Sequence, residues 1–296
     1  MAKVMRSVVR IVPTHSVMEG GGFKVRRPYS MSALLSPFLL LDEMGPNVTG
    51  PGEAVGAPWH PHRGFETVTY LLDGRMKHED SAGNRGELNP GDVQWMTAGR
   101  GIIHSELPHD EFQKTGGRTH GFQIWVNLPA EHKMMSPRYQ EIPATESPTI
   151  EKNGVWARVI AGECMGVSSS IDTVIPITLI HVRMEDGTHL KQQIESHLNS
   201  MIFVFSGEVN VQNETRVKKY PQVLGLGVNQ QVRDGELALL SEGPEVEIHS
   251  NGTSELLILA GPELNEPISR YGPFVMNTRE EIEQAFIDYR NGTLAT

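Results

Sequence analysis

The stretch from residue 59 to residue 106 decides how this chain folds. It begins Trp59-His60-Pro61-His62-Arg63-Gly64-Phe65-Glu66 and ends Gly101-Ile102-Ile103-His104-Ser105-Glu106. Side chains two residues apart in an extended strand point to the same face. His60 and His62 should therefore share one face, and so should His104 and Glu106. If both segments lie in one small β structure, three imidazoles and one carboxylate converge, which predicts a metal site.

The residues between these two pairs have the pattern of strands and turns. Residues 67–72 are rich in β-forming side chains and end at Asp73-Gly74, a turn signal. A second turn at residues 89–92 precedes the apolar strand expected at 93–96. The order of ligand pair, strand, turn, strand and ligand pair is that of a cupin, a jelly-roll-type β-barrel.

Four segments carry a resemblance to a known family. They are His-Pro-His-Arg-Gly-Phe-Glu-Thr-Val (60–68), Gly-Arg-Gly-Ile-Ile-His-Ser-Glu (99–106), Pro-Phe-Leu-Leu-Leu-Asp-Glu (37–43) and Tyr-Gly-Pro-Phe-Val-Met-Asn-Thr (271–278). These segments resemble the pirin family, in the right order and over almost the whole chain. The resemblance implies two cupin domains, with one mononuclear iron in the N-terminal domain. It also implies that the metal ligands are His60, His62, His104 and Glu106.

The expected fold is all-β, with two cupin domains and a short C-terminal helix. The first domain, residues 1–134, holds the metal site, and the second, residues 135–296, does not. Prolines at 129, 137, 143 and 148 indicate a linker near residues 132–150. The helix is expected over 278–291, because Thr278 and Glu281 form a capping box and Asn291-Gly292 ends the apolar stripe.

An internal duplication predicts that the second domain binds no metal. Aligning the two halves on their glycine turns places four residues where the first half has its candidate ligands: Gln193, Glu195, Ile248 and Ser250. This set lacks the imidazoles that a transition metal prefers.

Several side chains next to the candidate ligands have more than one interpretation. Glu106 is either a ligand only or a ligand that also acts as a base. Glu66 either orients a ligand imidazole or is an ordinary polar strand residue. Arg63 should point away from the ligands, into a surface interaction patch. A set of three aromatic residues is expected to pack inside the barrel rather than to stack on a substrate: Trp59, Phe65 and Trp95.

Composition limits the possible partners and compartments. The net charge of −10 argues against direct binding to nucleic acid or to an anionic membrane. No run approaches the roughly 20 apolar residues that span a bilayer, and the N-terminus lacks the apolar core of a signal peptide. A single cysteine, Cys164, cannot form an intrachain disulfide and is expected to be a buried hydrophobe. We expect a cytoplasmic monomer, with the nucleus as a further location if the source is a eukaryote.

Three histidines and one glutamate suit Fe(II), and also other divalent transition metals such as nickel, cobalt, manganese or copper. Four protein ligands leave two positions of an octahedral ion open. The resemblance implies a quercetin 2,3-dioxygenase that acts on an aromatic flavonol substrate. The alternative is a redox-sensing regulator of the transcription-cofactor type, which binds a protein partner through an iron-dependent conformation. A metal-dependent isomerase is a third interpretation. An enzyme needs an apolar cavity open to the metal, whereas a switch can have a closed site.

Overall fold

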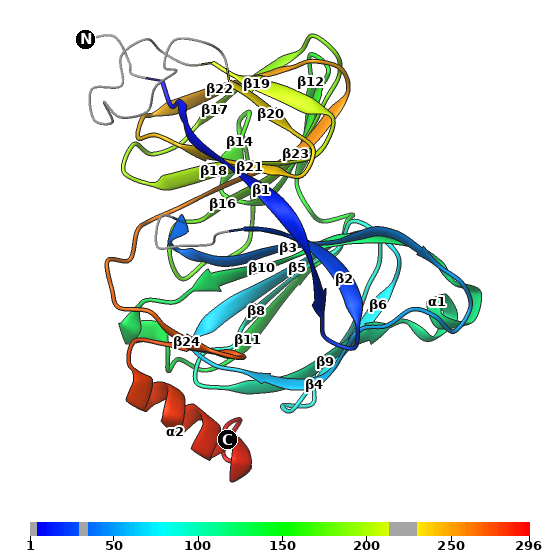
Figure 1. Ribbon diagram of the computed structural model, residues 1–296, viewed down its shortest axis with the longest axis vertical. Coiled ribbons are helices and arrows are strands. Elements are labelled where there is room, and N and C mark those ends of the chain that lie inside the picture. Colours follow the sequence, from blue (N-terminus) through cyan, green and yellow to red (C-terminus); the bar gives the residue numbers. More distant parts are fainter. Residues whose placement is uncertain (1–4, 30–34, 213–229) are drawn as a thin grey trace. The chain divides into compact units, whose positions relative to one another are not determined.

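The computed structural model describes residues 5–29, 35–212 and 230–296 (Figure 1). It is mostly β-sheet, with two cupin-type domains and one short C-terminal helix, as predicted. The chain forms two compact units. The first unit contains residues 16–27, 37–146 and 264–296, and the second contains residues 1–15, 28–36 and 147–263.

Most strands of the first unit form two antiparallel sheets. The strands of the larger sheet, in spatial order, are β11 (Arg138–Ile142), β8 (Val93–Thr97), β5 (Phe65–Asp73), β10 (Gly117–Asn127), β3 (Phe38–Thr49) and β2 (Phe23–Pro28). Those of the smaller sheet are β4 (Ala57–His62), β9 (Ile102–Pro108), β6 (Met76–Asp80) and β7 (Arg85–Leu88). The strands expected around residues 67–72 and 93–96 are therefore confirmed as β5 and β8.

Strand β5 lies inside the larger sheet and is buried on both faces. Its neighbours pair with it so that Val68 lies opposite Trp95 on β8 and Ile124 on β10. All three are fully buried and form an apolar face. On the other face, Thr69 lies opposite Gln94 and Gln123. Because cross-strand partners share a face, the polar side chains form a row, and this row faces the metal site described below.

The second unit also has two antiparallel sheets. The larger contains β1 (Val8–Glu19), β21 (Glu236–Leu240), β18 (Asn199–Ser206), β23 (Ser254–Gly261), β16 (Thr178–Met184), β13 (Val155–Ala161) and β12 (Thr149–Lys152). Up to His15, β1 belongs to this unit. The smaller sheet contains β17 (His189–Gln193), β22 (Glu245–Ser250), β19 (Glu208–Val211) and β20 (Gln230–Arg233), and a separate pair consists of β14 (Glu163–Cys164) and β15 (Val167–Ser168).

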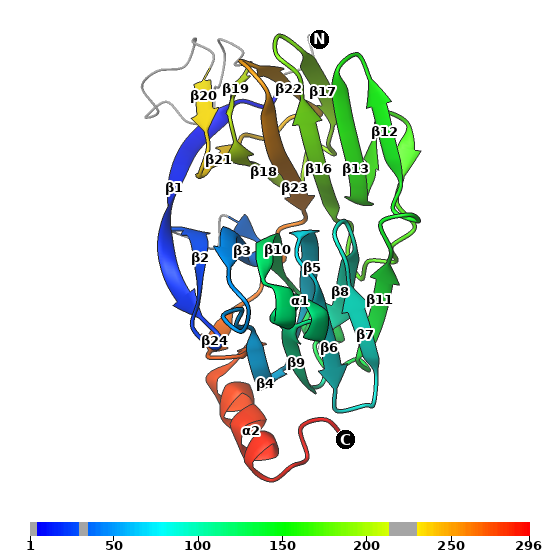
Figure 2. The same cartoon turned by 90° about the vertical axis from the view of Figure 1, so that its right-hand side faces the viewer.

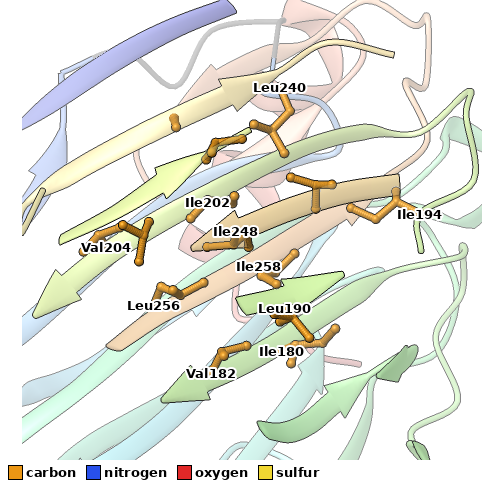
Figure 3. Packing of buried hydrophobic residues seen from close by; sticks show 14 of the residues in the cluster. Ile180, Val182, Leu190, Ile194, Ile202, Val204, Leu240, Ile248, Leu256 and Ile258 are labelled. Carbon is orange, nitrogen blue, oxygen red and sulfur yellow. The ribbon is translucent and has the colours of Figure 1, made fainter. Parts of the chain in front are cut away.

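The core of the second unit is almost entirely aliphatic. Ile202, Ile248 and Ile258 lie at its centre (Figure 3). Ile248 is the residue aligned with His104, so the place of an imidazole is taken here by an apolar core side chain. Cys164 belongs to the same cluster, and burial raises the pKa of its thiol to about 11.

The C-terminal segment belongs to the first unit, although it follows the second in sequence. It contains the hairpin of β24 (Ser269–Tyr271) and β25 (Phe274–Met276), then helix α2 (Arg279–Arg290), drawn in red in Figures 1 and 2. The predicted capping box is confirmed, because Thr278 and Glu281 each accept a hydrogen bond from the other's backbone N–H. The helix packs Ile282 and Ala285 against Phe274 and Leu294.

This division differs from the expected boundary between residues 134 and 135. Strand β11 pairs along β8 and extends the first unit to Glu146. Pro137 and Pro143 bracket β11, and an edge strand tolerates prolines at its ends, so the sequence resembled a linker. The exchange of residues 1–15, 28–36 and 264–296 between the halves leaves no local signal, because it depends on long-range packing.

Two further short helical segments complete the first unit, α1 (Asp110–Thr115) and a 3₁₀ turn at Ala130–His132. None of the helices in the described parts of the chain has the length and apolar character needed to cross a bilayer.

Candidate metal centre

Three imidazoles meet on two paired strands of the first unit. Strands β4 and β9 are antiparallel, and His60 lies directly opposite His104. The ring centroids of His60, His62 and His104 lie 4.3 to 5.0 Å apart, and one nitrogen of each ring lies within 4.8 Å of the others. Metal–nitrogen bonds of about 2.1 Å place ligand nitrogens up to about 4.2 Å apart. Small side-chain movements therefore bring all three nitrogens into bonding range, and the predicted convergence of the histidines is confirmed.

Burial keeps two of these rings neutral. His104 is fully buried and His62 is 4 % exposed. Desolvation, and then the charges of the neighbouring imidazoles, hold the pKa of both rings well below the usual 6.5. Both ring nitrogens of His104 are buried without a hydrogen-bond partner. A buried imidazole with no partner is costly, and a bound cation would satisfy its lone pair, so the donor set fits a divalent transition metal.

Backbone carbonyls select the tautomer of the other two rings. His60 Nδ1 lies 2.7 Å from the Pro58 carbonyl, and His62 Nδ1 lies 3.3 Å from the Pro273 carbonyl. A carbonyl can only accept, so each Nδ1 carries the proton. The Nε2 lone pair of each ring is left available for a metal. Pro273 comes from the C-terminal segment, and nothing in the sequence connects it with His62.

Glu106 lies beside the cluster and is held by a threonine. Its Oε2 is 3.9 Å from Nε2 of His104, while its Oε1 accepts a hydrogen bond of 2.9 Å from Thr69. The group of three mutually close donors does not itself include Glu106. The structure therefore brings three of the four predicted ligand side chains together and places the fourth next to His104.

The hydroxyl of Thr69 has two neighbours and only one proton. Besides Glu106 Oε1, the side-chain oxygen assigned to Gln123 also lies 2.9 Å away. Since the oxygen and nitrogen of an amide are assigned rather than seen, both contacts are satisfied when Gln123 turns its NH₂ group to Thr69. Thr69 then accepts from Gln123 and donates to Glu106. The alternating pattern of residues 120–128 predicts a barrel strand whose side chains either line the cavity next to the metal or belong to the core, and Gln123 lines that cavity. The pattern did not single out Thr69 or its contact with Glu106.

An ion pair with the C-terminal segment stabilises the loop after His62. Arg63 Nη1 binds Asp288 of α2 at 2.7 Å, and its Nε donates to the Arg100 carbonyl. Arg63 does point away from the cluster, but it is 4 % exposed, so the expected surface patch is wrong. Its charge was taken as a sign of exposure, because Asp288 lies 225 residues away in sequence.

The buried side chain of Lys133 stabilises the same region through hydrogen bonds. It is 1 % exposed, and its Nζ donates to the carbonyls of Gly64 and Val275 and to Asn127 Oδ1. Burial lowers the pKa of this amine to about 8. The absence of a side chain at Gly64 lets its backbone approach that of Val275 closely, since a Cβ at Gly64 would lie 2.0 Å from the Val275 carbonyl oxygen. Sequence reasoning missed Lys133 because isolated lysines are normally exposed.

Of the other residues discussed for this region, some lie in the core and one lines a cavity. Glu66 is fully buried and accepts a 2.6 Å hydrogen bond from Thr97. Phe65 and Trp95 are fully buried, as expected, whereas Trp59 is 52 % exposed. Trp59 instead lines a cavity, so its expected packing inside the barrel is wrong.

A cavity of about 980 Å³ opens onto the imidazole cluster, within the first unit. His60, His62 and Glu106 form part of its wall. Much of the remaining wall is apolar or aromatic and includes Phe23, Met44, Trp59, Trp125 and Tyr271. A concave, mainly apolar site with a few converging polar groups is typical of small-molecule binding.

Comparison with known proteins agrees with this architecture. The pirin family model matches residues 22–126, and the model of the pirin C-terminal cupin domain matches residues 179–295. The chain is 40% identical to human pirin over 291 residues, covering 97% of this chain and 93% of that protein. It is 40% identical to a Pseudomonas aeruginosa protein provisionally named a quercetin 2,3-dioxygenase, over 98% of both chains. A crystal structure of quercetin 2,3-dioxygenase from Acinetobacter baumannii superposes with a TM-score of 0.89 at 36% identity, covering 99% of both chains.

Proposed function

The chain belongs to the pirin family, and from this premise we propose that it is an Fe(II)-dependent quercetin 2,3-dioxygenase. The wider statement, that it is a cupin-type metal-binding protein, already follows from its fold, its imidazole cluster and its relatives. The proposal adds the metal, the reaction and the substrate. The observation that carries it is the cavity, because a largely apolar space of about 980 Å³ reaches three of the four candidate ligands.

The cavity favours an enzyme over a redox-sensing regulator that binds a protein partner. A regulator requires only that the metal change charge, and a closed site would serve that purpose. Here the wall next to His60, His62 and Glu106 is open to a molecule of substrate size. The names of two close relatives support the same choice, since both refer to quercetin 2,3-dioxygenase.

In the proposed site, His60, His62, His104 and Glu106 hold one ion. Fe(II) would supply a Lewis acid for the flavonol oxygens and redox chemistry with dioxygen. The overall reaction consumes one flavonol and one dioxygen, and yields one ring-opened ester and one carbon monoxide. Burial favours the neutral form of His62 and His104. Three neutral imidazoles and one carboxylate would leave a net positive charge at a divalent ion.

Glu106 can serve both as a ligand and as a proton acceptor in this arrangement. A carboxylate has about four lone-pair sites. Oε2, which faces His104, would be the oxygen that binds the metal. Oε1 uses one lone pair for the hydrogen bond from Thr69 and keeps one to take the 3-hydroxyl proton of the flavonol. The apolar part of the wall would contact the flat rings of the flavonol.

Quercetin consumption tests this function. The protein is loaded with Fe(II) under anaerobic conditions and is then mixed with quercetin in air-saturated buffer. The flavonol absorbance and the released carbon monoxide are followed over time. The wild type should release one carbon monoxide per quercetin, and His104→Ala should be inactive. His197→Ala, which changes an exposed histidine of the second unit, should retain full activity. Glu106→Gln should lower kcat by about 10²-fold or more. Absence of turnover with iron, nickel, cobalt, manganese and copper alike would reject the function.

A further inference from the structure

Arg270 reaches the cavity from the C-terminal segment and is held in a fixed position there. It lies on β24, and its guanidinium carbon is 4.6 Å from the centre of the Trp125 indole ring. Its Nη1 donates to the Leu39 carbonyl at 3.1 Å. Trp125 in turn meets the ring of His62 edge-on, with centroids 5.4 Å apart. A single indole therefore separates this guanidinium from a candidate metal ligand.

The other charged residues described here pair with one another, so they do not occupy the remaining N–H donors of Arg270. Arg27, on the same wall, is engaged by both oxygens of Asp42 and by Glu19, each at 2.6 Å. Arg75, also on the wall, is paired with Glu111 and Glu87. Within the described residues, Arg270 takes part in no ion pair, and a guanidinium has five N–H donors. Its stacking on the indole fixes the planar fork before a ligand arrives.

The surfaces next to Arg270 suit a flat aromatic molecule. Trp59, Trp125 and Tyr271 supply aromatic faces or edges, while Phe23 and Met44 supply apolar surface. The charges of Arg27, Arg270, Asp42 and Glu19 sum to zero, so attraction for an anion would come from the directed donors of Arg270 rather than from a general positive field. With neutral imidazoles, one divalent ion and Glu106 would add a net positive charge at the far side.

We propose that the cavity takes a planar aromatic substrate bearing an anionic oxygen, and that Arg270 binds this oxygen while the ring lies against the aromatic wall. This inference rests on the proposed function for the site and names a residue that selects its substrate. A phenolate or a carboxylate offers the in-plane lone pairs that a guanidinium fork binds best. Arg270 is thus a specificity-determining residue contributed by a segment 164 residues beyond Glu106 in the chain.

Binding of two naphthalene probes tests the proposal on the full-length, metal-loaded protein. The probes are 2-naphthoate and the neutral 2-naphthalenemethanol, which share one ring system, and affinities are measured by calorimetry at low ionic strength. The wild type should bind the carboxylate at least about tenfold more tightly, the usual effect of a hydrogen bond to a charged group. Arg270→Gln should lose this preference, and Arg270→Lys should keep part of it, because the charge remains without the fork.

Matched controls separate this role from other causes. Arg75→Gln removes the same charge from the same wall at a paired site, and should keep the preference. Binding of the neutral probe reports whether each variant is folded. A carboxylate bound directly to the metal would not depend on Arg270. Equal affinities for the two probes in the wild type, or an unchanged preference in Arg270→Gln, would overturn the proposal. Failure of quercetin turnover with the preference intact would instead reject only the dioxygenase function.

Discussion

Thr69 donates a hydrogen bond of 2.9 Å to Glu106, from a central strand of one sheet to the ligand strand of the other. Thr69 is 1 % exposed, and Gln123 lies beside it on β10. The hydroxyl leaves the other carboxylate oxygen free to face His104. The orientation of the one candidate ligand that is not an imidazole is therefore set by a neutral side chain that is not itself a candidate ligand.

Thr69→Val should weaken metal binding while leaving the fold in place. Valine has nearly the same shape but cannot donate, so the carboxylate loses its fixed orientation. Loss of such an orienting contact typically costs 10- to 100-fold in metal affinity, by order of magnitude. Competition between the protein and a coloured chelator measures this directly. Thr69→Ser, which keeps the hydroxyl, should restore most of the affinity. Equal affinities in the wild type and Thr69→Val would show that the contact does not matter.

The ion pair of Arg63 and Asp288 should stabilise the C-terminal helix. Their side chains are 5 % and 23 % exposed. Asp288→Ala leaves the Arg63 charge buried without its partner, and should lower the free energy of unfolding by about 2 kcal/mol. Arg279→Ala removes another arginine–carboxylate pair on the same helix, but those side chains are 85 % and 61 % exposed. It should cost about 0.5 kcal/mol or less. Urea denaturation of both variants checks the difference, and equal losses would contradict the structural role.

Lys133→Met should be strongly destabilising despite its close match in size. The methionine fills the space but leaves two carbonyls and Asn127 without their donor. We expect a loss of about 3 kcal/mol, measured by the same denaturation. Lys191→Met is the matched control, because this lysine on β17 is half-exposed and pairs with one carboxylate, that of Glu247. A Lys133→Met protein as stable as the control would show that the buried amine is dispensable.

The metal-free protein should lose stability as the pH falls below about 6.5. In the folded chain the pKa of His62 and of His104 is held well below 6.5 by burial. In the unfolded chain both rings titrate near 6.5. Below that value the unfolded state takes up protons that the folded state does not, so the stability present above pH 6.5 is lost. Two rings that stay neutral in the folded chain over this range account for about 3 kcal/mol between pH 7.5 and 5.5.

Comparison with a variant isolates this effect from the carboxylates. Unfolding of the wild type and of His104→Asn is followed at both pH values. Between the two pH values, the free energy of unfolding of the variant should fall by about 1 kcal/mol less than that of the wild type, whatever the absolute stability of the variant. If the two proteins lose the same amount, His104 is not the buried neutral group described here.

The fold and the imidazole cluster were predictable because they depend on local periodicity. Alternation placed His60 with His62 and His104 with Glu106, and the turn signals between them set the order of strands. The buried supports were not predictable. Pro273, Asp288 and Arg270 come from the C-terminal segment, and only packing brings them to the site. Strand β11 was not predicted for a different reason, because the prolines on either side of this edge strand resemble the prolines of a linker.

Exposure was the other quantity that the sequence did not determine. Arg63 and Lys133 are charged yet buried, while Trp59 is aromatic yet exposed on the cavity wall. For Arg63 and Lys133, the general preference of charged residues for the surface was outweighed by specific buried partners. Trp59 and Arg63 adjoin His60 and His62 in the chain, and Lys133 contacts Gly64 of the same segment. The reversals therefore occur next to the candidate ligands, where the site imposes demands beyond packing.

The most direct test of the account is to locate the metal. Crystals of the protein loaded with Fe(II) under anaerobic conditions would be measured above the iron absorption edge. We predict one anomalous peak per chain, about 2.0–2.2 Å from one nitrogen each of His60, His62 and His104 and from an oxygen of Glu106. A peak bound by other residues, or no peak at this cluster in protein that contains iron, would contradict the assignment of the metal centre.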